Sequence, residues 1–223
     1  MKNFKNLPYV MYTFLAIQSI IFLLMHGSTD TQTVIKFGGE YAPFIIQLHE
    51  YWRLVTPIFV HIGLTHFALN SFMLYFLGEQ IEIIYGHTRF FILYLISGIT
   101  GNILSFAIND IVVGAGASTS LFGMFGGFII LKRYLSHNPT IIALAKQYTI
   151  LVIINLIFNL FEPFVDIWGH LGGFIGGILL GIILAIPKQK HLYPIWERIL
   201  SGLILFAFFL LFLTFGFMKT RTI

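Results

Sequence analysis

Long uncharged runs alternate with short charged segments along the whole chain. The uncharged runs are predominantly apolar, and charged residues mark their boundaries. A helix needs about 20 such residues to cross the hydrocarbon core of a bilayer, and six of the seven runs reach that length. We therefore predict an all-α polytopic membrane protein whose seven transmembrane helices lie within residues 6–29, 54–78, 90–109, 111–131, 147–161, 167–187 and 199–218.

The fifth and the first of these runs differ from the rest. The fifth run, 147–161, is short, and we expect it to be extended by 141–145 or by Phe164 and Val165. The first run follows a basic N-terminus, as a secretory signal does, but it continues without an A-x-A-like cleavage pattern. We therefore expect it to be retained as the first span.

The composition agrees with a membrane protein and excludes other classes. Charged residues make up 10% of the chain and hydrophobic residues 57%, whereas a soluble domain has about 25% charged residues. The absence of cysteine excludes a disulfide scaffold and CxxC-type metal or redox sites. The net charge of +4 is small and scattered, so nucleic-acid binding is not indicated. No nucleotide-binding glycine motif is present, and we expect no cofactor.

The basic residues predict an orientation. With a cytoplasmic N-terminus, nine Lys and Arg residues fall in inside segments and four in outside segments, which is the bias that the positive-inside rule describes. The compact chain shows no large soluble domain. We therefore expect a multi-pass protein of a bacterial cell membrane with its N-terminus in the cytoplasm.

Polar residues inside three of the spans are the candidate functional residues, because such residues are costly in lipid. The second span carries His61, His66 and Asn70. The fourth span opens with GAGASTS, which contains Ser118, and the sixth opens with DIWGH, whose last residue is His170. These three spans run in the same direction, so His66, Ser118 and His170 are expected at similar depth in the outer half of the membrane. This predicts a shared polar cavity that opens to the exterior.

Two interpretations of Ser118 are open. A serine at the start of a helix is commonly an N-cap, and Ser118 has that position in the predicted fourth span. The small residues of segment 114–117 favour a second interpretation, because they permit a tight turn and close backbone approach. They also leave N–H groups at the positive end of a helix, where an oxyanion is stabilised.

His170 also allows two interpretations. A histidine in a membrane helix can simply form a hydrogen bond to a neighbouring helix. However, Gly173 and Gly177 fall near the same helix face, and small residues at this spacing let two helices pack closely. If the partner is the fourth span, His170 comes within reach of Ser118, which is the geometry of a nucleophile and its base.

His66 and Asn70 are four residues apart and share a helix face, so they suit the stabilisation of a carbonyl oxygen that becomes negative. His61 points away from His66 on a helix, and a metal site at this pair is the less favoured alternative. We assign no function to the other histidines, which are His26, His49, His87, His137 and His191.

Taken together, the motifs resemble those of the rhomboid family of intramembrane serine proteases. The first external loop carries a Trp-Arg pair, and the second span carries a His-x4-His-x3-Asn pattern followed by LNSFMLYFLGEQIE. The third-span region GHTRFFILYLISGITGNILS is also similar. The residues that carry the resemblance are Trp52, Arg53, His61, His66, Asn70, Gly116, Ala117, Ser118, His170, Gly173 and Gly177.

The resemblance implies a catalytic dyad in which Ser118 attacks a peptide carbonyl and His170 transfers the proton. It also implies an oxyanion hole made by His66, Asn70 and the backbone N–H of Ser118, and an aromatic ring at Phe122 against His170. Gly116, Gly173 and Gly177 would support this geometry. The implied substrates are the transmembrane segments of single-span proteins in the bilayer, cut near its outer face, and the short fifth helix would suit a movable lateral gate.

The implied architecture is one integral domain over 1–223, with a rhomboid-like six-helix core at about 6–187 and a seventh helix at about 199–218. The family commonly has Gly after the nucleophile, and Thr119 departs from this pattern, which puts rate and substrate preference in question. A catalytically inert rhomboid-like protein that binds transmembrane helices is one alternative, and a small transporter is another. The oligomeric state stays open.

Overall fold

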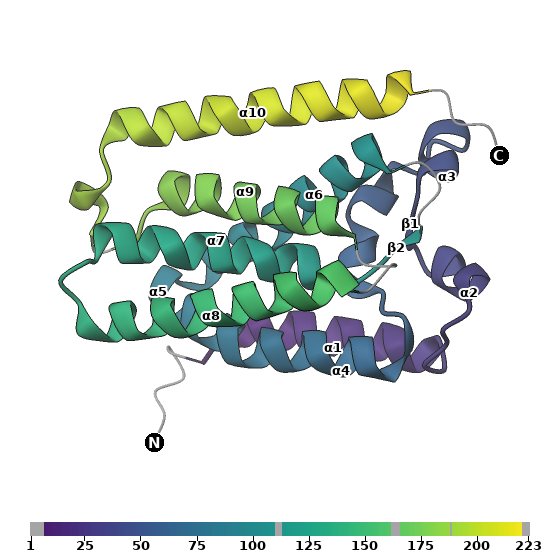
Figure 1. Ribbon diagram of the computed structural model, residues 1–223, viewed down its shortest axis with the longest axis horizontal. Coiled ribbons are helices and arrows are strands. Elements are labelled where there is room, and N and C mark those ends of the chain that lie inside the picture. Colours follow the sequence, from purple (N-terminus) through teal and green to yellow (C-terminus); the bar gives the residue numbers. More distant parts are fainter. Residues whose placement is uncertain (1–6, 110–112, 162–165, 188, 220–223) are drawn as a thin grey trace.

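The computed structural model describes residues 7–109, 113–161, 166–187 and 189–219, and it confirms the all-α class. Long helices lie alongside one another, with most of the short elements gathered at one end (Figure 1). The α-helices are α1 (Tyr9–Leu24), α2 (Thr31–Lys36), α3 (Ala42–Gln47), α4 (Gly63–Met73), α5 (Glu79–Tyr85), α6 (His87–Ile108), α7 (Ser118–Tyr134), α8 (Pro139–Phe161), α9 (Ile167–Leu184) and α10 (Ile195–Met218).

Helices α6, α7 and α9 form the centre of the bundle, and each contacts the other two extensively. Helix α8 packs on α7, while α10 runs along α9 and α6 on one face of the bundle (Figure 1). We call one end of the bundle the Ser118 end, where α7 and α9 begin and α6 ends. The opposite end is the Leu184 end, where α6 and α10 begin and α7 and α9 end.

Three described helices, α6, α9 and α10, are long and apolar enough to cross a membrane by length and composition alone. The described part of the chain also contains two shorter apolar helices, Tyr9–Leu24 and Pro139–Ile153. A multi-pass membrane protein follows from these helices. The count of seven spans stays a prediction.

The predicted boundaries of the second run, 54–78, are wrong at both ends. Its first residues lie in the 3-10 turns η2 (Tyr51–Leu54) and η3 (Thr56–Phe59), and α4 begins only at Gly63. At the other end, α4 continues through the π-helical turn η4 (Leu74–Gly78) into α5. The acidic residues after Gly78 therefore do not end the helix.

Glu82 explains why the helix continues past its charged residues. It is 1% exposed, and its carboxylate accepts hydrogen bonds from the backbone N–H groups of Val10 at 3.0 Å and Met11 at 2.7 Å. His87 Nδ1 lies 2.6 Å from the same carboxylate. The first N–H groups of a helix have no hydrogen-bond acceptor within that helix. Glu82 provides the acceptor for α1, although it is 71 residues away from Met11 in sequence.

The fifth run is longer than the sequence suggested. Helix α8 has 23 residues and begins at Pro139, so it includes 141–145, one of the two expected extensions. The other extension, Phe164 and Val165, lies outside the described residues. The expected extension by 141–145 is thus confirmed, and because α8 is not a short helix, its length gives no support to a movable gate.

The loop between α1 and α4 contributes one strand to the only strand pairing in the described residues. Strand β1 (Glu40–Tyr41) pairs antiparallel with β2 (Val113–Gly114), with Glu40 opposite Gly114 and Tyr41 opposite Val113. This pairing joins the first loop to the segment that leads into α7. In the same loop Asp30 caps α2, and the Thr33 backbone N–H holds the pKa of the Asp30 carboxyl below its usual value.

Replacement of Glu82 tests the cap on α1. Glu82→Ala would leave two buried N–H groups without an acceptor, and we expect a loss of about 2–4 kcal/mol in the free energy of unfolding. Glu82→Gln keeps one acceptor oxygen and should lose less. Thermal unfolding in detergent measures both, with Glu79→Ala, one turn earlier in α5, as the matched control. Equal losses for Glu79→Ala and Glu82→Ala would contradict the assignment.

Candidate active site

Ser118 and His170 are hydrogen-bonded to each other. The distance from Ser118 Oγ to His170 Nε2 is 2.9 Å, between the first residue of α7 and the first turn of α9. The ring of Phe122, one turn after Ser118, stacks on the His170 ring with centroids 4.4 Å apart and an interplanar angle of 15°. His170 is only 6% exposed. A half-buried hydroxyl is therefore held against a buried imidazole.

The N-cap interpretation of Ser118 is wrong. Ala117 occupies the cap position of α7, and no side chain caps that helix. The Ser118 hydroxyl instead points to His170.

Glycines let α7 and α9 approach closely enough for this hydrogen bond. A Cβ at Gly173 would collide with the backbone carbonyl of Thr119, and one at Gly177 with the carbonyl of Gly123. Both obstacles are backbone atoms, which cannot rotate away as a side chain does. The sequence interpretation of Gly173 and Gly177 as a packing stripe, with α7 as the partner, therefore agrees with the geometry.

The segment before Ser118 is held by three contacts. Gly116 has φ +127°, a conformation that favours glycine, and its N–H donates to the Pro57 carbonyl at 2.9 Å. The Ala117 N–H donates to His61 Nε2 at 3.3 Å. Because β2 pairs with β1 just upstream, the backbone that precedes Ser118 is fixed on three sides.

His61 is the residue that sequence reasoning undervalued. It lies before α4 rather than in a helix, so the expected direction away from His66 does not apply. Its side chain is fully buried, and its ring lies 5.3 Å from that of His66. The contact to the Ala117 N–H gives it a positioning function. Its occurrence in an apolar run was a signal, but only the structure shows the partner.

His66 faces the same segment. A Cβ at Gly116 would lie 2.6 Å from His66 Nε2, so the ring contacts the backbone two residues before Ser118. His66 Nδ1 accepts the Ile62 backbone N–H at 3.3 Å. In a neutral imidazole only one nitrogen accepts, so the proton of His66 is on Nε2, the nitrogen that faces Gly116.

Asn70 lies one turn further along α4 and is 6% exposed. Its Nδ2 donates one hydrogen to the His66 carbonyl at 2.9 Å, which leaves the second amide hydrogen for another acceptor. Its Oδ1 has no hydrogen-bond partner among the described residues. Asn70 is therefore joined to His66, and the hydrogen bond from its amide goes to that residue rather than to Ser118.

Asp166 caps α9 and links it to α6. Its Oδ1 accepts from the Gly169 backbone N–H and from Asn109 Nδ2, both at 2.9 Å. These contacts fix the N-terminal turn that carries His170.

Thr119 occupies the space between α6 and α9. A Cβ at Gly101 would lie 2.8 Å from Thr119 Cβ, and one at Gly169 would lie 3.1 Å from Thr119 Cγ2. The absence of side chains at these two glycines makes room for Thr119. A small cavity of about 20 Å³, lined by both polar and apolar groups, adjoins Ser118 and has room for about one water molecule. It is lined by Glu40, Pro57, Asn102, Gly114, Ala115, Gly116, Ser118, Thr119 and Asp166.

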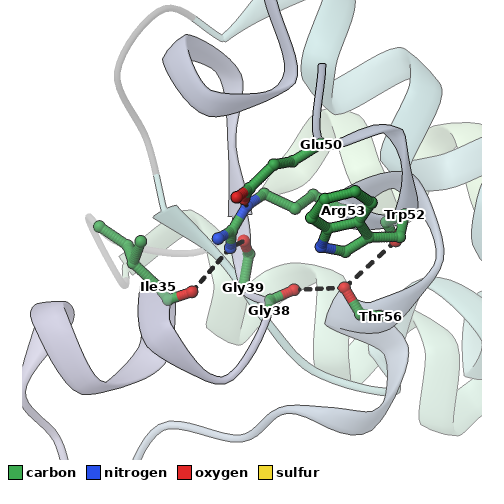
Figure 2. A network of polar contacts seen from close by, with 7 residues as sticks. All are labelled: Ile35, Gly38, Gly39, Glu50, Trp52, Arg53 and Thr56. Atoms are coloured by element: carbon green, nitrogen blue, oxygen red, sulfur yellow. Dashed lines mark hydrogen bonds and ion pairs between the residues drawn. The ribbon is translucent and has the colours of Figure 1, made fainter. Parts of the chain in front are cut away.

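Arg53 holds the first loop in place (Figure 2). Its guanidinium donates to the carbonyls of Ile35 at 2.7 Å and Gly39 at 2.8 Å, and its Nε pairs with Glu50 at 2.5 Å. The residue after Gly39 begins β1. Arg53 thus supports the strand pair that precedes Ser118.

The matches with known proteins agree with this arrangement. The Rhomboid domain model matches residues 48–187. The chain belongs to the rhomboid family. The resemblance seen in the motifs is thereby confirmed, and the match covers α4 to α9, including Ser118, His170, His61, His66 and Asn70.

Several rhomboid proteins are similar to this chain. Rhomboid protease GluP of Bacillus subtilis (strain 168) is 37% identical over 213 residues, which cover 94% of this chain and 41% of GluP. RHOMBOID-like protein 1 of Arabidopsis thaliana is 38% identical over 142 residues, 63% of this chain and 36% of that protein. Inactive RHOMBOID-like protein 8 of the same plant is 32% identical over 145 residues, 64% of this chain and 41% of that protein. The chain thus spans about two fifths of the length of these relatives.

A substitution at the contact of α7 and α9 tests the packing. In Gly177→Ala the new Cβ meets the Gly123 carbonyl, so the helices must separate, and we expect a loss of about 1–3 kcal/mol in the free energy of unfolding. Gly202→Ala in α10 is the matched control, because nothing lies within 4 Å of a Cβ there. Thermal unfolding of both variants in detergent gives the comparison. The packing argument fails if Gly177→Ala is as stable as Gly202→Ala.

Proposed function

We propose that this rhomboid protein is an intramembrane serine endopeptidase that uses Ser118 and His170 as its catalytic dyad. The hydrogen bond of 2.9 Å between Ser118 Oγ and His170 Nε2 carries the proposal. A nucleophile within reach of a base, with the base held by a third group, is the arrangement of covalent catalysis. Here the third group is the Phe122 ring, which stacks on the imidazole.

The dyad chemistry follows from these positions. Ser118 Oγ attacks the carbonyl carbon of the scissile peptide, and its proton passes to His170 Nε2. The tetrahedral intermediate then expels the amine, which takes that proton, and an ester to Ser118 is left. A water molecule attacks the ester, gives its proton to His170, and releases the carboxylic acid as Ser118 regains its hydroxyl. The cavity beside Ser118 has the size and polarity for such a water.

The oxyanion of the intermediate has donors nearby. Ser118 is the first residue of α7, and the N–H groups of a first helical turn have no partner within the helix. They stabilise negative charge together with the helix dipole. His66 Nε2 and the free hydrogen of Asn70 Nδ2 supply side-chain donors from α4. Gly116 keeps the approach open, because any Cβ there would contact the His66 ring.

Transmembrane segments of single-span proteins are the proposed substrates, cut near the outer face of a bacterial cell membrane, with the N-terminus of this chain in the cytoplasm. A substrate helix must unwind to expose its carbonyl, and lipid offers no hydrogen bonds to the freed backbone, whereas the polar groups around Ser118 do. Helix α8 packs on α7, the helix that carries Ser118, and we place the entry of substrate beside it. The single domain over 1–223, with its core at about 6–187, is part of this proposal.

The dyad is tested by removing each member. Ser118→Ala and His170→Ala are each expected to lower cleavage of a tagged single-span substrate by at least about 10³-fold, because neither residue acts without the other. Labelling by a fluorophosphonate should disappear in Ser118→Ala. Ser120→Ala is the control, since this buried hydroxyl lies two residues away and has no hydrogen-bond partner among the described residues.

Labelling that survives Ser118→Ala, or disappears in Ser120→Ala, would overturn the assignment. An intact dyad that neither cleaves nor reacts with the probe would instead favour a catalytically inert protein that binds transmembrane helices. One similar protein carries the word "Inactive" in its name, so this outcome has a precedent in the family.

The oxyanion donors are tested on α4. His66→Ala and Asn70→Ala are each expected to lower kcat by about 10²-fold with a smaller change in KM, because each removes a donor used mainly in the transition state. Ser71→Ala is the matched control, since its hydroxyl accepts from Gln18 of α1 on another side of α4. A change in KM alone would assign His66 and Asn70 to substrate binding.

A further inference from the structure

Two arginines meet at the last turn of α9, at the Leu184 end of the bundle. Arg89, from the first turn of α6, donates its Nε–H to the Leu184 carbonyl at 3.1 Å. Arg198, from the first turn of α10, donates its Nε–H to the Ile183 carbonyl at 3.0 Å. Two guanidinium groups from different helices are thus brought to neighbouring carbonyls.

The backbone explains why both carbonyls accept from side chains. The last carbonyls of a helix commonly accept from backbone N–H groups of the residues that follow. After Leu184 the chain leaves the helix at Ala185, which has φ +46°. No backbone N–H of a described residue reaches the carbonyls of Ile183 or Leu184. Arg89 and Arg198 therefore provide the hydrogen-bond donors for the last two carbonyls of α9.

This arrangement concentrates positive charge. Each guanidinium has five N–H donors, and the hydrogen bond to the α9 carbonyl uses one of them. In the described part of the chain, neither arginine has a carboxylate within 4 Å. Glu197, next to Arg198, is bound to Arg133 and to the Tyr134 hydroxyl.

The buried Glu82 of α5 is also engaged elsewhere. Glu82 faces the N-terminus of α1. The exposed Lys190, in the turn η5 (Lys190–Leu192), adds a further positive charge between α9 and α10.

The ends of three candidate membrane spans coincide here, which is where lipid headgroups are expected. Helices α6 and α10 begin here and α9 ends here, and all three meet the criteria for a membrane span. Trp196, 62% exposed in the first turn of α10, has the position of an interfacial aromatic residue. Arg89 and Arg198 are both half-buried rather than extended into solvent.

We propose that Arg89 and Arg198 bind the phosphate of an anionic phospholipid at the Leu184 end. A guanidinium matches phosphate with paired donors and tolerates a partly buried site. Basic pockets between transmembrane helices bind anionic headgroups in this way. A lipid with a choline headgroup fits less well, because its ammonium would lie against two arginines with no carboxylate beside them. The proposal does not depend on the dyad or on which leaflet this end faces.

The test compares two lipids with the same acyl chains. The full chain in detergent is mixed with phosphatidylglycerol or phosphatidylcholine, and retained lipid is measured by native mass spectrometry. We expect the wild type to retain phosphatidylglycerol preferentially. Arg89→Gln and Arg198→Gln should each weaken that retention about fivefold, because each removes one cation that attracts the anionic headgroup. If the two contributions are independent, the double variant weakens it about 25-fold. Arg133→Gln is the matched control, because Arg133 is paired with Glu197.

The outcomes separate lipid binding from a purely structural cap. If the arginines only complete α9, the wild type shows no preference between the lipids, and this result overturns the proposal. Unchanged retention in both single variants overturns it as well. Excess inorganic phosphate that displaces the lipid would assign the site to soluble phosphate instead. Thermal unfolding in phosphatidylcholine alone checks folding, and the single variants give the answer if the double variant does not fold.

Discussion

The close contact between the backbones of α7 and α9 is the constraint on which the site depends. In a membrane, an apolar side chain gains little free energy by moving from the lipid into a helix interface. Helices therefore associate through van der Waals packing and polar contacts. At Gly173 and Gly177 the backbone of α9 lies directly on that of α7. Only at this separation does the imidazole of one helix reach the hydroxyl of the other at 2.9 Å. The close helix packing and the hydrogen bond of the dyad therefore both require glycine at these positions.

A second constraint concerns the irregular backbone around the site. Turns and short strands expose N–H and C=O groups that helices satisfy internally, and a membrane protein must supply partners for them. Here single buried side chains do so. Arg53 binds two loop carbonyls, and His61 accepts the N–H of Ala117. Away from the site, Glu82 does the same for two N–H groups at the start of α1. With 10% charged residues in the chain, much of the buried charge serves the backbone rather than the reaction.

The sequence predicted those features that repeat or that stand out against an apolar background. The uncharged runs predicted the class, and the polar residues in three spans indicated Ser118, His170 and His66, which the fold brings to one place. The error at the end of the second run arose because a charged residue, Glu82, is buried. The predicted second span ends at residue 78, before Glu79, but α5 continues through Glu79 and Glu82 because Glu82 has partners on α1. Strands β1 and β2 have two residues each and no periodicity to detect.

His61 and Thr119 show a further limit, because their functions depend on contacts between distant segments. Thr119 departs from the glycine common in the family, and taken alone this change suggests a narrower cavity. In the structure its Cβ and methyl group lie against Gly101 of α6 and Gly169 of α9. A residue larger than glycine at either position would occupy the same space. The residue after the nucleophile therefore has to be considered together with positions 101 and 169, since the three share one volume between α6, α7 and α9.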